Sequence, residues 1–210
     1  MALEDWLRIA ETGSDDDVRE WILTGTASGK PFTPYVPTLA LPAGVSSVLD
    51  FGCGLGRNFP YLTSIARRVT GFDLSPMIAR CRALPPAPTV SLSDDWDAVS
   101  RGRFDLIFAS LVLQHLDGGS IRSRLADFSR MAPVVYLLTR ADSDAGDRVL
   151  DVVARAGAFE IGECVEVEHD NDSHQLRVIR RLPVDEAKRQ PSGHYEVLLR
   201  SIGAKPTGSG

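Results

Sequence analysis

The run Val48-Leu49-Asp50-Phe51-Gly52-Cys53-Gly54-Leu55-Gly56-Arg57-Asn58 decides the fold of this chain. A short apolar segment, typical of a buried strand, leads into a turn with glycine at every second position, and a helical pattern follows. Glycines in such a turn let the backbone approach a ligand closely and leave amides at the start of the helix free for a carboxylate or phosphate. The run therefore predicts a strand–loop–helix unit with a ligand at its loop.

The spacing of the glycines argues against a dinucleotide as that ligand. A G-x-G-x-x-G fingerprint needs its third glycine where this chain has Arg57. Asp50 lies two residues before the first glycine, where a carboxylate would repel a pyrophosphate but attract an ammonium. The loop suits a ligand with an amino-acid end, whose carboxylate meets the amides and whose amine lies near Asp50. A tight turn without a ligand is the alternative.

A second acid, Asp73, follows the next apolar run in Val69-Thr70-Gly71-Phe72-Asp73-Leu74-Ser75. An acid at the carboxyl end of a second strand is typically where the hydroxyls of a ribose are held. Asp73 also precedes a helical pattern that opens at Ser75, so a role as helix N-cap is the alternative, and the two roles are compatible.

Short apolar runs alternate with amphipathic segments between residues 45 and 140. Such runs suit parallel strands covered on both faces by helices, and the rhythm predicts an α/β fold with a doubly wound, mostly parallel sheet. A helix over 143–156, closed by Gly157, is followed by strand patterns that should pair antiparallel at the sheet edge. The expected strands are 47–51, 68–72, 89–92, 104–110, 134–139, 159–168, 175–180 and 194–201, and the other expected helices are 58–67, 76–84 and 121–131.

Composition narrows the class of protein. The 210 residues, 43% of them hydrophobic, fit one globular domain with an attached cap. Acidic residues exceed basic ones by 28 − 23 = 5, which argues against binding of duplex nucleic acid by phosphate neutralisation. Three cysteines do not make a disulfide framework and fit a reducing compartment. No apolar stretch is long enough to span a membrane, and the acidic N-terminus is unlike a signal peptide, so we expect a cytoplasmic protein.

Three zones divide the chain. Residues 1–44 form an N-terminal cap or lid, with Ser14 as the expected N-cap of a helix that runs to about Leu23. Phe32 and Tyr35 stand between prolines in this zone and are candidate acceptor-binding residues of a lid, or alternatively pin the zone to the sheet. Residues 45–203 form the main domain, and residues 204–210 form a disordered tail.

The motifs Asp50-x-Gly52-x-Gly54-x-Gly56 and Gly71-x-Asp73-x-Ser75, with the run that starts at Phe104 and ends in Leu113-Gln114-His115-Leu116, resemble class I S-adenosylmethionine-dependent methyltransferases. The resemblance covers roughly residues 45–140. It implies a seven-stranded, Rossmann-like sheet with an antiparallel edge strand, S-adenosylmethionine as cofactor and S-adenosylhomocysteine as product. By resemblance, the cofactor lies against Asp50, Gly52, Cys53, Gly54 and Gly56, and against Asp73 with Leu74 at the ribose.

Two further parts of the cofactor site follow from the same resemblance. An acid after the third strand usually lies near the adenine amino group, and here that acid is Asp94 or Asp95, with Trp96 beside the ring. Ser110, after the fourth strand, would lie below the donor sulfur. No metal site is predicted. His115 is a candidate general base, and a structural role at the start of a helix is its alternative.

We expect a methyltransferase that acts on an oxygen or nitrogen nucleophile of a small-molecule acceptor. The first alternative is a protein or RNA methyltransferase, for which the basic cluster Arg177-Val178-Ile179-Arg180-Arg181 would have to be functional; a solvated edge strand guarded by charge is the other interpretation of that cluster. A catalytically silent donor-binding subunit is the second alternative. A nicotinamide-dependent oxidoreductase is disfavoured by the glycine spacing. The oligomeric state and the identity of the acceptor do not follow from the sequence.

Overall fold

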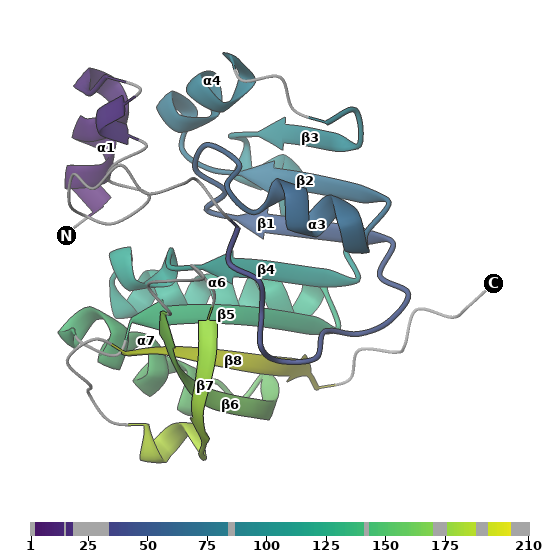
Figure 1. The fold of residues 1–210 in the computed structure, drawn as a ribbon, viewed down its shortest axis with the longest axis vertical. Coiled ribbons are helices and arrows are strands. Elements are labelled where there is room, and N and C mark those ends of the chain that lie inside the picture. The colour runs from purple at the N-terminus through teal and green to yellow at the C-terminus, as the bar shows by residue number, and fades with distance from the viewer. Residues whose placement is uncertain are drawn as a thin grey trace.

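The computed structural model describes residues 3–14, 16–18, 34–83, 87–140, 143–169, 176–187 and 193–202. Helices and strands alternate through most of this part of the chain (Figure 1). The helices are α1 (Leu3–Thr12), α3 (Phe59–Ile65), α4 (Ser75–Ala83), α5 (Trp96–Val99), α6 (Gly118–Met131) and α7 (Asp144–Ala154), with short 3-10 turns η1 (Leu113–His115) and η2 (Val184–Glu186). The strands are β1 (Ser47–Phe51), β2 (Arg68–Phe72), β3 (Val90–Ser93), β4 (Leu106–Ser110), β5 (Val134–Arg140), β6 (Phe159–His169), β7 (Leu176–Arg181) and β8 (Gly193–Ser201).

The strands form one sheet in the order β3-β2-β1-β4-β5-β8-β6-β7. Strands β1 to β5 are parallel, and β8 pairs antiparallel with β5 on one side and with β6 on the other. The α/β class and the mostly parallel sheet are therefore confirmed. The seven strands that the resemblance implies are corrected to eight within the described residues, because β7 adds an antiparallel edge strand beyond β6; the strand patterns of the sequence predict eight.

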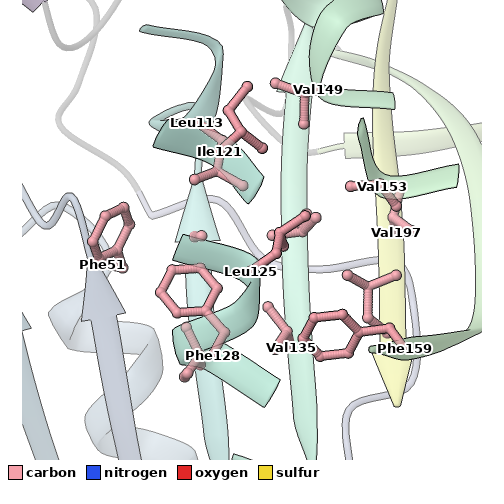
Figure 2. Close-up of a cluster of buried hydrophobic side chains, with 14 of the residues drawn as sticks. Phe51, Leu113, Ile121, Leu125, Phe128, Val135, Val149, Val153, Phe159 and Val197 are labelled. Atoms are coloured by element: carbon pink, nitrogen blue, oxygen red, sulfur yellow. The ribbon is translucent and has the colours of Figure 1, made fainter. Parts of the chain in front are cut away.

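Each face of the sheet carries its own hydrophobic core, because side chains alternate between the two faces along a strand. Leu49 and Phe51 of β1 belong to the core under α6 and α7, which Figure 2 shows around Leu125 and Phe128. Val48 belongs to the opposite core, under α3 and α4. Asp50 alternates with Leu49 and Phe51, so its side chain lies on this second face.

The expected strands and helices of the parallel half match the structure to within a few residues, and β1 and β2 match at both ends. Helix α1 and the single turn α5 were not expected. Of the helix expected after Ser14, residues 16–18 are helical and the rest lies outside the described residues. The Ser14 cap is confirmed: its Oγ accepts from the amide of Asp17 at 3.1 Å, and Asp17 accepts from the Ser14 amide at 2.7 Å.

Helix α1 lies beyond the carboxyl ends of the parallel strands (Figure 1). Its residues Ile9 and Ala10 pack in a small core with Leu55 of the glycine turn and Met77 of α4. Arg80 of α4 donates to the carbonyls of Ala10, at 2.7 Å, and Gly13, at 2.5 Å. These contacts dock α1 above the edge of the sheet where the ligand loop was expected.

Candidate functional site

The loop after β1 takes a backbone that only glycine adopts without strain. Gly52, Gly54 and Gly56 have φ angles of +76°, +56° and +82°. A Cβ on Gly52 would lie 2.3 Å from a methyl carbon of Val112. The amides of Gly52 and Cys53 donate to the carbonyl of Phe72, at 2.8 and 3.1 Å, which ties the loop to the end of β2.

The expectation that the loop amides are free for a ligand carboxylate needs correction. Besides Gly52 and Cys53, the amide of Gly54 donates to Asp73 and that of Gly56 donates to the carbonyl of Cys53. Four backbone amides of the loop therefore donate to acceptors within the protein. The glycines allow a tight loop, and a ligand carboxylate has to find much of its binding energy elsewhere.

Asp73 lies directly opposite this loop. Its two carboxylate oxygens accept from the amides of Gly54 and Leu74, both at 2.7 Å. Both donors lie outside α4, so these contacts do not make Asp73 the N-cap of that helix. Burial raises the pKa of Asp73, and the two amide hydrogen bonds act in the opposite direction. Since a carboxylate has about four lone-pair sites, Asp73 can still accept from two further hydroxyl donors.

Asp50 is buried behind the loop with 1% of its surface exposed. Neither of its carboxylate oxygens has a hydrogen-bond partner within the part of the chain that the structure describes. Burial raises the pKa of Asp50 well above its usual range, and the nearby Asp73 and Cys81 raise it further. A buried, unpaired carboxylate is costly, so its position at the ligand loop is a feature that a cationic ligand group would explain.

A pocket of about 980 Å³, including space open to solvent, joins these elements. Gly52, Cys53, Gly54, Asp73 and Leu74 line one side of it, and Ser110 lies at the end of β4 with its Oγ buried and unpartnered among the described residues. Leu111 follows with a φ of +56°, a strained value for a residue with a branched side chain. Strain and an unsatisfied hydroxyl at one spot are typical of a functional site.

Residues 49–132, from the third residue of β1 to the residue that follows α6, match the family described as a methyltransferase domain. The match spans the glycine loop, Asp73 and Ser110. Over this stretch the chain therefore contains a methyltransferase domain. S-adenosylmethionine is the cofactor that the resemblance of the sequence implies for it.

Solved structures share the fold of this methyltransferase. A TehB-like S-adenosylmethionine-dependent methyltransferase from Corynebacterium glutamicum is 21% identical, with 95% of each chain covered and a TM-score of 0.53. The N-methyltransferase NodS from Bradyrhizobium japonicum, in complex with S-adenosylhomocysteine, is 19% identical, with 75% of this chain and 78% of that chain covered and a TM-score of 0.53. No curated protein matches the chain. Among the helices described, none has the length and apolar character needed to cross a membrane.

The residues present fit this cofactor on the structure's own terms. S-adenosylmethionine carries an ammonium, and the buried oxygens of Asp50 have no cationic or donor partner among the described residues. The ribose carries two hydroxyl donors, and Asp73 faces the pocket with lone pairs remaining. Gly52 leaves no room for a side chain between the loop and Val112.

The residues after β3 of the methyltransferase lie outside the lining of this pocket. Asp95 is the N-cap of α5, where it accepts from the amide of Ala98 at 3.0 Å. Asp94 is exposed and accepts from the hydroxyl of Ser75 at 2.6 Å, which lowers its pKa. Trp96 packs edge-on against Phe51 and Phe72, whose ring centres lie 5.4 and 5.0 Å from its own, and both phenylalanines line the pocket. Trp96 therefore supports the pocket wall from behind.

The remaining wall comes from outside the motifs. Tyr35 and His115 line the pocket, as do Arg57 and Asn58 at the start of α3 and Trp6 from α1. The ring of Trp6 stands edge-on to His115 at 5.4 Å between centres. Phe32 lies outside the described residues. Gly56 and Asp50 support the loop and are not among the lining residues.

Sequence reasoning missed Trp6, Arg57 and Asn58 as site residues. For Arg57 and Asn58 a signal was available, because they follow the last glycine directly. Trp6 carried no such signal, since its place depends on α1 folding back across the sheet edge.

Proposed function

We propose that this methyltransferase transfers the methyl group to an oxygen or nitrogen atom of a small-molecule acceptor. One observation carries the proposal: Asp73, Ser110 and His115 share a single pocket with the glycine loop, and α1 closes it from above.

Three carboxylates would divide the donor between them. Asp50 offers two unpaired oxygens for the ammonium, and Asp73 offers its remaining lone pairs to the ribose hydroxyls. We assign the adenine amino group to Asp94, because the carboxylate of Asp95 already caps α5. Gly52 and Gly54 would let the donor lie against the backbone.

When bound, S-adenosylmethionine supplies a methyl group on a sulfonium: a bond forms from the acceptor atom to the methyl carbon as the carbon–sulfur bond breaks, and its electron pair stays on sulfur. The protein's main task is to align the two partners, which contributes up to about 7–11 kcal/mol in well-oriented systems. Leu111 and Val112, beside Ser110, shape the apolar wall that excludes water. A hydroxyl or ammonium acceptor must lose a proton, and we assign its removal to His115.

The basic cluster on β7 supports a small acceptor over RNA. Arg177, Arg180 and Arg181 pair with Glu168, Glu166 and Glu163 of β6, in that order. Their charge is balanced by neighbours on the same sheet, which favours the interpretation of β7 as a charged, solvated edge strand.

Calorimetric titration with S-adenosylhomocysteine tests the donor site. We expect micromolar binding to the wild type and a loss of at least about tenfold in Asp73→Ala, because each charge-assisted hydrogen bond contributes about 1.5–3 kcal/mol. Asp151→Ala, an exposed acid on α7, is the control and should bind like the wild type. If the wild type does not bind, the proposed function fails.

A screen of acceptors with labelled donor then tests the role of His115. Once an acceptor is found, His115→Gln should lower kcat by about 10²–10⁴-fold and change the shape of the pH–rate profile. Its affinity for S-adenosylhomocysteine should change less than about threefold. A structural role would instead lower the melting temperature and leave the shape of the pH profile unchanged. Donor binding without turnover on any acceptor would favour the silent-subunit alternative.

A further inference from the structure

Arg57 is a nearly buried cation in the wall of the pocket. Only 7% of its surface is exposed, and its guanidinium carbon lies 3.9 Å from the centre of the Tyr35 ring. The ring face offsets part of the cost of burying this charge. A guanidinium also presents five N–H donors in a planar fork, so it can bind a ligand while keeping its contacts within the protein.

Asn58, next in the chain, lines the same pocket. It is 6% exposed, and its Oδ1 accepts from the amide of Tyr35 at 3.1 Å. This hydrogen bond fixes which end of the side-chain amide is the oxygen. The group that can serve a ligand is the NH2 of the side-chain amide, with two N–H donors.

The charged residues that line the pocket indicate the charge of the ligand group that would bind beside Arg57. Among the described lining residues, Arg57 is the permanent cation and Asp73 the carboxylate, and Asp73 faces the amides of Gly54 and Leu74. The other walls are mainly apolar or aromatic. A single planar cation with a neighbouring amide matches a singly charged, planar carboxylate better than a phosphate dianion.

We propose that Arg57 and Asn58 form a carboxylate-binding subsite in the methyl-transfer pocket. The inference rests on the proposed function, because it takes the pocket to hold the donor and the acceptor. The amides of Gly52, Cys53, Gly54 and Gly56 already donate within the protein, so a ligand carboxylate needs other donors. Arg57 and Asn58 would supply them. The carboxylate has two sources: the methionine end of the donor, or an acidic acceptor.

The test compares Arg57→Met with Arg101→Met, the same change at an exposed arginine. Donor-side binding is measured with S-adenosylhomocysteine and with 5′-methylthioadenosine, which lacks the amino-acid end. Acceptor-side binding is measured on protein saturated with S-adenosylhomocysteine, using matched acids and amides such as phenylacetate and phenylacetamide. Circular dichroism and thermal melting establish that each variant is folded.

Two results support the subsite and identify its ligand. If the donor supplies the carboxylate, Arg57→Met weakens S-adenosylhomocysteine by at least about tenfold and leaves 5′-methylthioadenosine unchanged. If the acceptor supplies it, both adenosine ligands bind as in the wild type, and the acid loses at least about tenfold while the amide does not. Arg101→Met should match the wild type in every titration.

The proposal is overturned if Arg57→Met binds all four probes like the wild type, or if it weakens S-adenosylhomocysteine and 5′-methylthioadenosine equally. Should Arg57→Met not fold, Arg57→Lys serves in its place, because lysine keeps the charge but loses the planar fork; it should weaken the same carboxylate probe by about threefold or more, and an unchanged affinity overturns the proposal. Failure of the wild type to bind S-adenosylhomocysteine would instead count against the proposed function.

Discussion

Asp50 and Glu196 are two buried carboxylates on the same face of the sheet, with 1% and 0% of their surfaces exposed. Asp50 lies near the end of β1, at the ligand loop, and Glu196 lies in β8. The oxygens of Asp50 have no partner among the described residues. Those of Glu196 accept from the Thr38 amide, at 2.9 and 3.1 Å, from the Thr38 hydroxyl and from the Tyr136 hydroxyl at 2.7 Å.

The difference separates a carboxylate that stabilises the fold from one that is kept for a ligand. Glu196 fastens the segment before β1, which carries Tyr35, to the centre of the sheet. Burial and the neighbouring Glu196 carboxylate raise the pKa of Tyr136 well above its usual range, so its hydroxyl stays protonated and keeps donating. Asp50 has no hydrogen bonds of this kind among the described residues to offset the cost of burying its carboxylate. Native proteins retain such a destabilising group mainly at functional sites.

Removal of Glu196 should have the largest effect on stability. Glu196→Ala leaves the Thr38 amide, the Thr38 hydroxyl and the Tyr136 hydroxyl without their acceptor in a buried place. We expect the free energy of unfolding to fall by about 3–5 kcal/mol, measured by urea denaturation at pH 7. Glu160→Ala, an exposed glutamate on β6, should change it by less than about 0.5 kcal/mol. A loss of under about 1 kcal/mol in Glu196→Ala would show that water replaces the hydrogen bonds of Glu196. Glu196 would then not differ from Asp50 as a carboxylate that stabilises the fold.

Asp50→Asn should act in the opposite direction and by less. The pKa of Asp50 is raised in the folded state, so between the unfolded value near 3.8 and the folded value the native protein binds more protons than the unfolded chain. Stability of the wild type therefore falls as pH rises through that window, and Asn removes this loss. We expect Asp50→Asn to gain about 1–2 kcal/mol at pH 7 and little at pH 4, by calorimetry across pH.

The same variant should bind the donor worse, because Asp50 is our partner for its ammonium. Affinity for S-adenosylhomocysteine should drop at least about tenfold. Asp105→Asn is the matched control: Asp105 accepts from the amides of Ser46 and Ser47, both at 2.9 Å, so the change should destabilise the protein and leave donor affinity alone. If Asp50→Asn destabilises the protein as Asp105→Asn does, Asp50 has a structural partner and the comparison with Glu196 is wrong.

A region could be predicted from the sequence when its contacts lie close together along the chain, and could not when its partners are far away in the sequence. The glycine loop, β1 and β2 were predictable because strand, turn and helix signals lie within a few residues of one another. The place of β8 between β5 and β6 was not, because strand pairing depends on partners far along the chain. Glu196 shows the reason: its donor Thr38 is 158 positions away. Nothing local distinguishes this glutamate from Glu160 of β6, which is exposed.

The candidate site likewise has residues that could be predicted from local sequence and residues that could not. Asp73 could be placed from its distance to the glycines, and the structure brings it to Gly54. The choice between Asp94 and Asp95 could not be made, because it depends on the single turn of α5, which is too short to give a periodic signal. Whether Asp94 reaches adenine stays a prediction.

The smallest effect is expected at the exposed edge of the same sheet. Arg181 pairs with Glu163 across β7 and β6, but the two side chains are 65% and 38% exposed. Water screens such a pair, and ordering two long side chains offsets most of the remaining attraction. Arg181→Gln should therefore shift the melting temperature by less than about 2 °C, and 0.5 M NaCl should not change that difference. A shift approaching that of Glu196→Ala would mean that the β6–β7 ion pairs act as one cooperative network, so that burial would no longer explain which carboxylates of this sheet stabilise the fold.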